Sequence, residues 1–353
     1  MTATITDVAR RANVSTATVS RVLSGGGGAR DQTRDRVLTA ARELGYRPSG
    51  VARSLRQRAT RTLGLIVTDI ENPFFPELVR NVEDAAREHG YAILLCNASD
   101  DPEREAGYLE LLVDRWVDGV VIAASNLGVR HREWLLAARL PIILVNSVDR
   151  QIDLPTIASD SVMGGRLATE HLLELGHRRF GIITAGPRNL DAPDRLAGAR
   201  TALRAAGVPT SAEHVAIGEA TVAGGQRAAA AILAADPAVT ALVAYNDLTA
   251  IGAMRAVRAG GRRVPHDVSV VGFDDVHLAA FVDPPLTTIA QQTAEMGRWA
   301  VEQLARRLSR PVAGAGADVQ GAGDGGLGPE PAPHVILPVR LEIRGSTGPA
   351  PTA

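Results

Sequence analysis

Lysine is absent from this chain of 353 residues, so its basic side chains other than histidine are all arginine. Cys96 is the only cysteine, which excludes an internal disulfide and is typical of a protein in a reducing compartment. No stretch approaches the run of about 18 apolar residues that a membrane helix needs. The N-terminus shows no signal segment with a charged and then an apolar part. We therefore expect a cytoplasmic protein without membrane contact.

The sequence also has little that points to catalysis. It contains no P-loop and no Cys/His spacing for a metal, and its glycine pairs at 164–165, 224–225 and 260–261 do not make a GxGxxG motif after a strand. Asp274 and Asp275 could imitate a pair of catalytic carboxylates, but neighbouring residues in a turn usually point apart and no poised nucleophile is nearby. We expect no enzyme activity, no cofactor and no metal site.

Positive charge is concentrated at one end of the chain. Residues 1–60 hold eleven arginines against four acidic residues, a formal charge of +7, although the whole chain carries −1. The remaining residues therefore carry −8. A basic end on an acidic body is expected when only that end meets nucleic acid phosphates.

Two short helices are predicted between residues 4 and 23. Thr4 and Asp7 form a start that resembles a capping box, and apolar residues follow at helical spacing. Ser15 is placed to cap a second helix with a buried apolar stripe. The outward positions of that helix carry small polar side chains, which let a backbone approach a phosphodiester, and one arginine that can reach a phosphate or a guanine edge: Thr16, Ala17, Ser20 and Arg21. This pattern predicts a helix-turn-helix DNA-binding unit.

The stretch ITDVARRANVSTATVSRVL resembles the start of the LacI/GalR (lactose-repressor) family of bacterial transcription regulators. We expect a three-helix head over residues 1–48, with a third helix in TRDRVLTAARELGY that adds Val37, Leu38, Ala41 and Leu44 to its core. Asp31 is expected to cap that helix, because Arg30 stands where the family generally has a serine. The expected DNA contacts of the head are Thr4, Ser15, Thr16, Ala17, Thr18, Ser20 and Arg21.

Residues 49–60 are expected to form a hinge between the head and the rest of the chain. The segment SGVARSLRQR is too short to hold a helix alone in water, so it can fold only when docked. The resemblance implies a hinge helix paired between two subunits over the minor groove, with Leu55 at the position that wedges into a base step. An apolar wedge between arginines suits that role, and a plain linker is the alternative. The residues concerned are Ser49, Ala52, Arg53, Leu55 and Arg56.

From Leu63 onward, short apolar runs alternate with amphipathic helices in two rounds, which predicts two α/β lobes built on parallel sheets. We expect one lobe over 61–160, completed by about 290–310, and the other over 161–289, completed by about 334–344. Residues 311–333 are rich in Gly, Ala and Pro and predict a disordered loop. The tail at 345–353 is expected to be unstructured. It has no leucine heptad for a coiled coil, so we expect a homodimer.

The resemblance extends over nearly the whole chain. NPFF at 72–75, RLAG at 195–198, AYNDLTAIGA at 244–253, DVSVVGFDD at 267–275 and PPLTTIAQ at 284–291 are similar to the core of the same family. That core is similar in fold to periplasmic sugar-binding proteins. The fold class that it implies is α/β, with a helix-turn-helix head before a two-lobed core of parallel sheets flanked by helices.

Several polar residues follow directly after predicted strands, where a ligand in a cleft between two lobes would meet them. Carboxylates and amides accept hydrogen bonds from hydroxyl groups, and an arginine donates a rigid fork, so the set suits a sugar. Asp and Asn are also common after strands for their own turn bonding. The resemblance matches Arg195, Asn246 and Asp274 to effector-binding positions. The full expected set is Phe74, Phe75, Asn126, Asn146, Arg195, Asn246, Asp247, Asp274 and Gln291.

The function implied is a ligand-responsive, sequence-specific transcription regulator. We expect a repressor of carbohydrate uptake or breakdown genes that binds pseudo-palindromic operator DNA as a homodimer and is relieved by a sugar-type inducer. One alternative keeps the fold but has a purine or nucleoside corepressor, or a coactivating partner. A sugar-binding transport protein is the alternative from another class, and the basic head disfavours it.

Overall fold

The structure is a computed structural model, and it describes residues 3–23, 29–46, 59–114, 117–124, 135, 140–147, 153–309 and 332–352. The chain divides into two compact units, Met1–Arg61 and Thr62–Ala353. Some predictions fall outside the described residues. These are the hinge segment with Ser49, Ala52, Arg53, Leu55 and Arg56, the effector residue Asn126, and the loop 311–333 apart from its last two residues.

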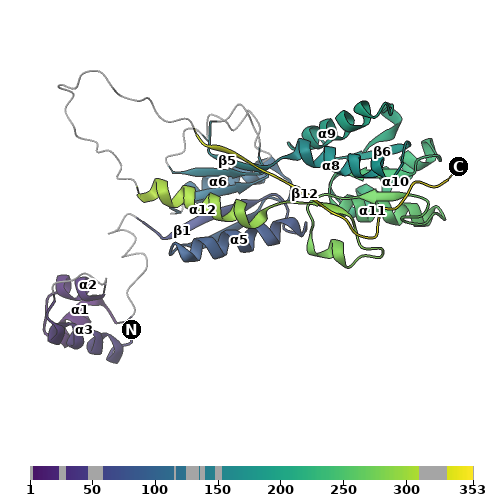
Figure 1. Cartoon of the computed structure of the whole chain (residues 1–353). Helices are drawn as coiled ribbons and strands as arrows, with labels where there is room; N and C mark the ends of the chain where they lie inside the picture. Colours follow the sequence, from purple (N-terminus) through teal and green to yellow (C-terminus); the bar gives the residue numbers. More distant parts are fainter. Residues whose placement is uncertain are drawn as a thin grey trace, which may run out of the picture. The chain divides into compact units, whose positions relative to one another are not determined.

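The first unit contains α1 (Ile5–Ala12), α2 (Thr16–Leu23) and α3 (Asp31–Glu43) (Figure 1). Thr4 and Asp7 form the predicted capping box at the start of α1. Asn13 ends α1 in the left-handed conformation, with a φ of 55°, which an asparagine tolerates well. The Oγ of Ser15 accepts a hydrogen bond from the backbone N–H of Thr18 at 3.2 Å, so the predicted cap of α2 is confirmed.

The three helices enclose one small apolar core, in which Val8, Val19 and Val37 are fully buried. Leu38 and Leu44 are partly buried against it, as predicted for the third helix. The prediction that Asp31 caps α3 is wrong. Arg30 occupies the capping position with an extended backbone and no side-chain hydrogen bond, so Asp31 is already inside the first turn. There its charge favours the positive end of the helix dipole.

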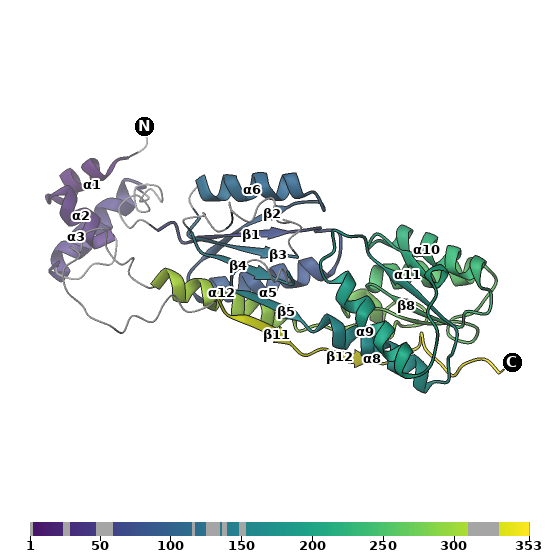
Figure 2. The ribbon, with the colours of Figure 1, turned by 90° about the horizontal axis from the view of Figure 1, so that it is seen from above.

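The second unit begins with a six-stranded parallel sheet in the order β11-β5-β4-β3-β1-β2. Its strands are β1 (Thr62–Val67), β2 (Ala92–Asn97), β3 (Gly119–Ala123), β4 (Ile142–Val145), β5 (Thr156–Ser159) and β11 (His334–Leu337). Apolar side chains point from both faces of this sheet, so both must be covered. On one face lie α5 (Phe74–Glu88) and α12 (Thr293–Ser309), and on the other lies α6 (Pro102–Asp114) (Figure 2).

The second lobe repeats the design with a four-stranded parallel sheet in the order β7-β6-β8-β9. Its strands are β6 (Phe180–Thr184), β7 (Val215–Ile217), β8 (Ala241–Ala244) and β9 (Ser269–Val271). The pair α8 (Ser161–Glu174) and α9 (Ala192–Ala205) covers one face. The pair α10 (Val222–Ala235) and α11 (Asp247–Ala259) covers the other. Two short 3₁₀ helices, η1 (Ala212–His214) and η2 (His277–Ala280), complete the lobe.

The chain crosses between the lobes three times, which confirms the predicted two-lobed α/β fold. The crossings run from β5 to α8, from β10 (Thr288–Ala290) to α12, and from β11 to β12 (Arg340–Glu342). One domain boundary was wrong, because β11 does not belong to the second lobe. The preceding helix α12 packs on the first lobe, so the chain returns as the edge strand β11 beside β5, where His334 pairs with Thr156. Only β12 pairs within the other lobe, with β10.

The prediction of an unstructured tail at 345–353 is also wrong as far as residue 352. Ser346 is fully buried, and its hydroxyl donates to the carbonyl of Val270 at 2.6 Å and accepts from the N–H of Thr287 at 2.8 Å. Further along, the N–H of Ala350 donates to the carbonyl of Leu175. Gly, Pro and Thr give this segment the composition of a disordered tail. Its order comes from side-chain and backbone hydrogen bonds to distant parts of the chain, which composition does not reveal.

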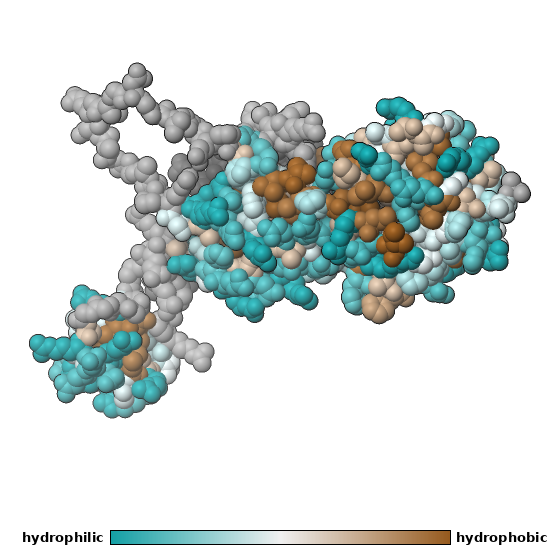
Figure 3. Space-filling view, viewed as in Figure 1, coloured by the Kyte–Doolittle hydropathy of each residue, from teal (hydrophilic) through white to brown (hydrophobic). Residues whose placement is uncertain are grey.

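No helix in the described ranges is both long and apolar enough to cross a membrane. The apolar side chains that reach the surface of the second unit form patches among hydrophilic surface (Figure 3). Among the described residues, the most exposed of the large ones are Phe281, with 71% of its area accessible, and Ile343, with 64%.

We expect Ser346→Ala to lower the free energy of unfolding of the second unit by about 2–4 kcal/mol, because two buried backbone groups lose their partner. Thr352→Ala, at an exposed position of the same tail, should change it by less than about 0.5 kcal/mol. Urea denaturation of both variants measures the difference. Equal stabilities would mean that the tail does not hold the lobe.

Candidate functional site

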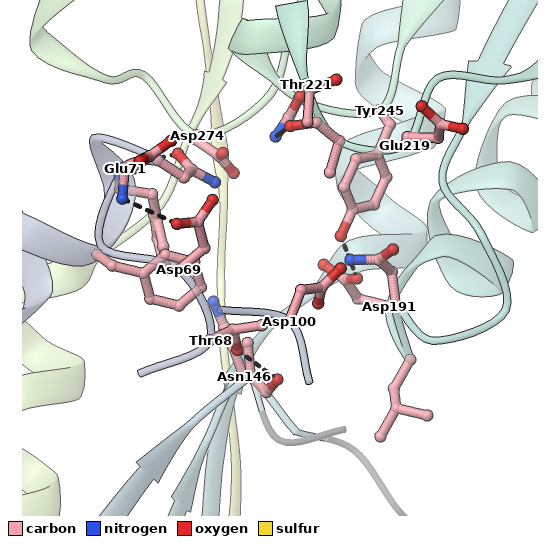
Figure 4. A pocket seen from close by; sticks show the side chains of 18 of the residues that line it. Thr68, Asp69, Glu71, Asp100, Asn146, Asp191, Glu219, Thr221, Tyr245 and Asp274 are labelled. Atoms are coloured by element: carbon pink, nitrogen blue, oxygen red, sulfur yellow. Dashed lines mark hydrogen bonds between the residues drawn. The ribbon is translucent and has the colours of Figure 1, made fainter. Parts of the chain in front are cut away.

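Polar side chains from the carboxyl ends of both parallel sheets meet in a cleft of about 340 Å³ between the two lobes (Figure 4). This volume suits a small ligand, and the carboxyl edge is where α/β sheets bind ligands. The described residues hold no group of three or more side chains suited to a metal ion. The cleft is lined by Thr68, Asp69, Glu71, Asn72, Phe74, Phe75, Asn97, Ser99, Asp100, Ala124, Asn146, Asn189, Leu190, Asp191, Arg195, Glu219, Ala220, Thr221, Tyr245, Asn246, Asp274 and Gln291.

The wall from the first lobe is shaped by side chains that bond to nearby backbone. The hydroxyl of Thr68, just after β1, donates to the carbonyl of Ala124 beyond β3 at 2.8 Å. The amide oxygen of Asn72 accepts from the N–H of Phe74 at 3.2 Å, which fixes the start of α5. Phe74 and Phe75 then meet edge to face with ring centroids 5.3 Å apart. Both rings are more than nine-tenths buried, so they contribute a firm apolar side to the cleft.

In the second lobe, the close packing of α8 on α9 sets the position of Arg195. A Cβ on Gly165 would stand 2.0 Å from the carbonyl oxygen of Arg195, and one on Gly198 would stand 2.0 Å from that of Val162. Only glycine fits at these two points of contact. Because the helix backbones touch here, the start of α9 is held against the lobe and Arg195 is directed into its interior.

Arg195 is the centre of a buried group of charges. Its guanidinium donates to the Asp191 carboxylate at 2.5 Å and to the carbonyl of Tyr245 at 2.6 Å, and it lies 3.7 Å from a carboxylate oxygen of Asp274. The guanidinium carbon also stands 3.6 Å from the centre of the Phe273 ring, a cation–π geometry. Among the described residues, its Nε is the only buried side-chain nitrogen or oxygen without a hydrogen-bond partner.

Burial and these contacts change the protonation of the group. Burial raises the pKa of Asp274 to about 7, although the charge of Arg195 lowers it. Burial, and then the charge of Asp191, raises the pKa of Tyr245 well above its ordinary value, so its hydroxyl keeps its proton and donates to Asp191 at 2.6 Å. Burial is the largest single effect and lowers the pKa of the Arg195 guanidinium, but the charges of Asp191 and its other acidic neighbours together outweigh burial, so this pKa is raised.

A chain of hydrogen bonds connects this group to the crossings between the lobes. Gln291 follows β10, and its amide nitrogen donates to Asp274 at 2.7 Å. Its amide oxygen accepts from Asn146 at 3.0 Å and from the hydroxyl of Ser159 at 2.7 Å, both in the first lobe. Asn146 in turn accepts from the N–H of Ser159. The floor of the cleft is thus built from two of the three crossings.

The structure brings most of the predicted effector residues together. Those that line the cleft are Phe74, Phe75, Asn146, Arg195, Asn246, Asp274 and Gln291. Asp247 does not line it, and its prediction as an effector contact is corrected. It is fully buried at the start of α11, where it accepts from the hydroxyl of Thr288 at 2.5 Å and from the N–H of Val276 at 2.8 Å. Its carboxylate is used to join β10 to the turn after β9.

Several lining residues were missed. Asn97 and Ser99 follow the apolar run YAILLC, so the rule that selected the other polar residues after strands would also have found them. Asp191 stands four residues before Arg195, a spacing that places an acid and a base together on a helix. Glu219 and Thr221 follow the apolar run HVAIG and could have been found in the same way, whereas Tyr245 gave no comparable signal.

The predicted DNA contacts lie in the first unit. Thr16, Ala17 and Arg21 are exposed on α2, while Ser20 and Thr18 are partly buried. Thr4 and Ser15 are exposed but act as caps of α1 and α2. A helix with a small-residue start and an exposed arginine can enter a major groove and reach base edges.

Comparisons with known proteins match both units. Residues 4–49 match the family model "Bacterial regulatory proteins, lacI family", and residues 60–318 match "Periplasmic binding proteins and sugar binding domain of LacI family". A ribose operon repressor of Haemophilus influenzae is 36% identical over 309 residues, 88% of this chain and 93% of that protein. A structure of the lac repressor dimer bound to operator and the anti-inducer ONPF is 27% identical, with a TM-score of 0.83 over 99% of this chain and 100% of that one. A complex of the regulator CelR with cellobiose is 31% identical, with a TM-score of 0.69 over 98% and 99%.

The raised pKa of Asp274 predicts how stability depends on pH. The unfolded chain releases this proton near pH 3.8, whereas the folded lobe holds it until about pH 7. Stability from this group is therefore greatest at low pH and is lost as the pH rises to about 7. Relative to Asp274→Asn, the unfolding free energy of the unmodified protein should fall by up to about 1.4 kcal/mol per pH unit between pH 4.5 and 7.

Urea denaturation at several pH values measures this difference, and Glu83→Gln, which removes an exposed carboxylate from α5, is the control. The control should stay parallel to the unmodified protein. A difference for Asp274→Asn that is flat, or that rises with pH, would contradict the buried protonated carboxyl.

Proposed function

From the premise that this chain belongs to the lacI family of bacterial regulatory proteins, we propose that it represses carbohydrate genes until a sugar bound in the cleft releases it from operator DNA. The observation that carries the proposal is the cleft itself. Amide, carboxyl and guanidinium groups face one small space beside a Phe74–Phe75 wall, within the same chain as a basic helix-turn-helix unit. Such a set can hydrogen-bond to several hydroxyl groups and cover one apolar sugar face.

The DNA-binding part of the proposal rests on α2. Its exposed residues Thr16, Ala17 and Arg21 suit the major groove, and the net charge of +7 over residues 1–60 supplies attraction to phosphate. A related repressor is described as a dimer bound to its operator, and we propose the same assembly for this chain. Two heads related by a twofold axis would read a pseudo-palindromic site.

The link between ligand and DNA is proposed to run through the crossings. A ligand that bonds to residues of both lobes stabilises one angle between them, and Gln291 passes that change to Asn146 and Ser159. Coupling between two sites in regulators is typically about 1–3 kcal/mol, which is a change of roughly 5- to 150-fold in affinity. This range is enough to switch operator binding.

Fluorescence anisotropy of the protein on its upstream DNA, at fixed salt, tests the proposal. Arg21→Ala should weaken specific binding by about 1–3 kcal/mol, because a base-edge contact is lost. Arg36→Ala removes the same charge from an exposed position of α3 and should weaken specific and scrambled DNA alike. Adding a sugar recognised by the cleft should lower the affinity of the unmodified protein.

If the two variants behave alike on specific and scrambled DNA, α2 does not read sequence. If a ligand tightens operator binding instead of weakening it, that ligand is a corepressor and not an inducer. A panel of ligands that includes sugars and purines distinguishes these two cases.

The proposed dimer has a candidate surface at η2. Leu278 and Phe281 are exposed by 49% and 71%, and the centre of the Phe281 ring lies 4.7 Å from that of the His277 ring. Exposed apolar anchors of this kind are typical of subunit contacts.

Phe281→Asp should raise the dimer dissociation constant at least about tenfold, because a charge would have to be buried without a partner. Ile217→Asp, at a 57% exposed position of β7, is the matched control and should leave assembly unchanged. Sedimentation velocity over a concentration series measures both. A dimer that Phe281→Asp leaves intact would exclude η2 from the interface.

A further inference from the structure

The charges along the cleft narrow the class of ligand that it can hold. Six carboxyl groups line it, and Arg195 is the one cation among the described lining residues. Several of the acids reach the open space from both lobes (Figure 4). The carboxyl groups are those of Asp69, Glu71, Asp100, Asp191, Glu219 and Asp274.

Arg195 is already neutralised by its own neighbours. Its two terminal nitrogens donate to Asp191 and to the carbonyl of Tyr245, and Asp274 lies 3.7 Å away. An arginine that binds a phosphate usually presents both terminal nitrogens as a fork. Here that fork is occupied, so an incoming anion would have to displace a carboxylate from a buried ion pair.

Two other arginines lie near the rim of the cleft, but they do not remove the excess of acidic groups along it. Arg188 extends across the cleft and donates to the carbonyl of Asp100 at 3.3 Å, and Arg227 pairs with Glu219. Both arginine side chains are exposed, so water and salt screen their charges. The described residues that line the cleft therefore hold more acidic than basic groups.

An uncharged polyhydroxyl compound fits this site better than its phosphorylated form. Its hydroxyl groups can donate hydrogen bonds to the carboxyl oxygens that line the cleft. A phosphate brings only acceptors at neutral pH and adds negative charge to a cleft whose described lining holds six carboxyl groups and one cation. The hydrogen-bonding groups and the charges of the cleft thus both favour an uncharged polyhydroxyl ligand.

We propose that the cleft selects free, unphosphorylated polyhydroxyl ligands and rejects their phosphate esters. This inference rests on the proposed function of the cleft as the effector site. It goes further, because a sugar-responsive regulator can respond either to a free sugar or to a sugar phosphate, and the charges of this cleft decide between the two.

Calorimetric titration of the full chain with matched pairs tests the inference. The probes are ribose and ribose 5-phosphate, glucose and glucose 6-phosphate, and adenosine and adenosine monophosphate. In each pair that binds, we expect the phosphorylated member to bind at least about tenfold more weakly. A phosphorylated member that binds as tightly as its partner, or more tightly, overturns the inference but leaves a cleft that binds effectors. If no probe binds, the proposed function of the cleft fails with it.

A pair of variants tests whether the charge of the cleft, and not its shape, sets the preference for the free over the phosphorylated ligand. Asp191→Asn keeps a hydrogen-bond acceptor for Arg195 but removes the charge that neutralises it, so the ratio between free and phosphorylated ligand should fall at least about threefold. Asp194→Asn removes the same charge from α9 at a residue that does not line the cleft, and it should leave the ratio unchanged. Equal effects of the two variants would show that charge at Asp191 does not set the selectivity. Circular dichroism verifies that both variants fold.

Discussion

A single buried guanidinium organises the second lobe. Arg195 is 8% exposed, and removing such a charge from water is costly unless it is paired and hydrogen-bonded. The guanidinium is paired with Asp191, donates to the carbonyl of Tyr245 and lies 3.7 Å from Asp274; these groups come from the start of α9, the end of β8 and the turn after β9. The same contacts that stabilise the charge also place the three groups around one cleft. Stability of the lobe and the arrangement of the cleft therefore depend on the same ion group.

The ion group and the lobe crossings are joined through one side chain. The amide of Gln291 uses its nitrogen for Asp274 and its oxygen for Asn146 and Ser159. An amide suits this position because it donates on one side and accepts on the other. A change in the protonation or the contacts of Asp274 thus alters a hydrogen bond that also holds the other lobe. The cleft and the crossings form one hydrogen-bonded unit.

The sequence predicted best what is local or repeated. The capping residues Thr4 and Ser15 act within one turn, and the alternation of strands and helices repeats often enough to reveal two lobes. The sequence did not predict the role of side chains whose hydrogen-bond partners lie far away in the chain. Asp247 and Asp274 both follow apolar strands, and only the fold shows that Thr288 and Val276 bind the first while the second reaches the cleft. Ser346 is ordered by Val270 and Thr287, far away in the sequence.

The packing of the second lobe indicates where the core can change shape. Gly165 and Gly198 let α8 touch α9, and Gly225 and Gly252 do the same for α10 and α11 on the opposite face. Helices at such close approach cannot slide without a clash, so the lobe behaves as a rigid body. The crossings between the lobes are fewer and more polar, and their hydrogen bonds can exchange partners. Under the proposed function, a ligand held by both lobes would change mainly the angle between them, and this is the change that we propose Gln291 transmits.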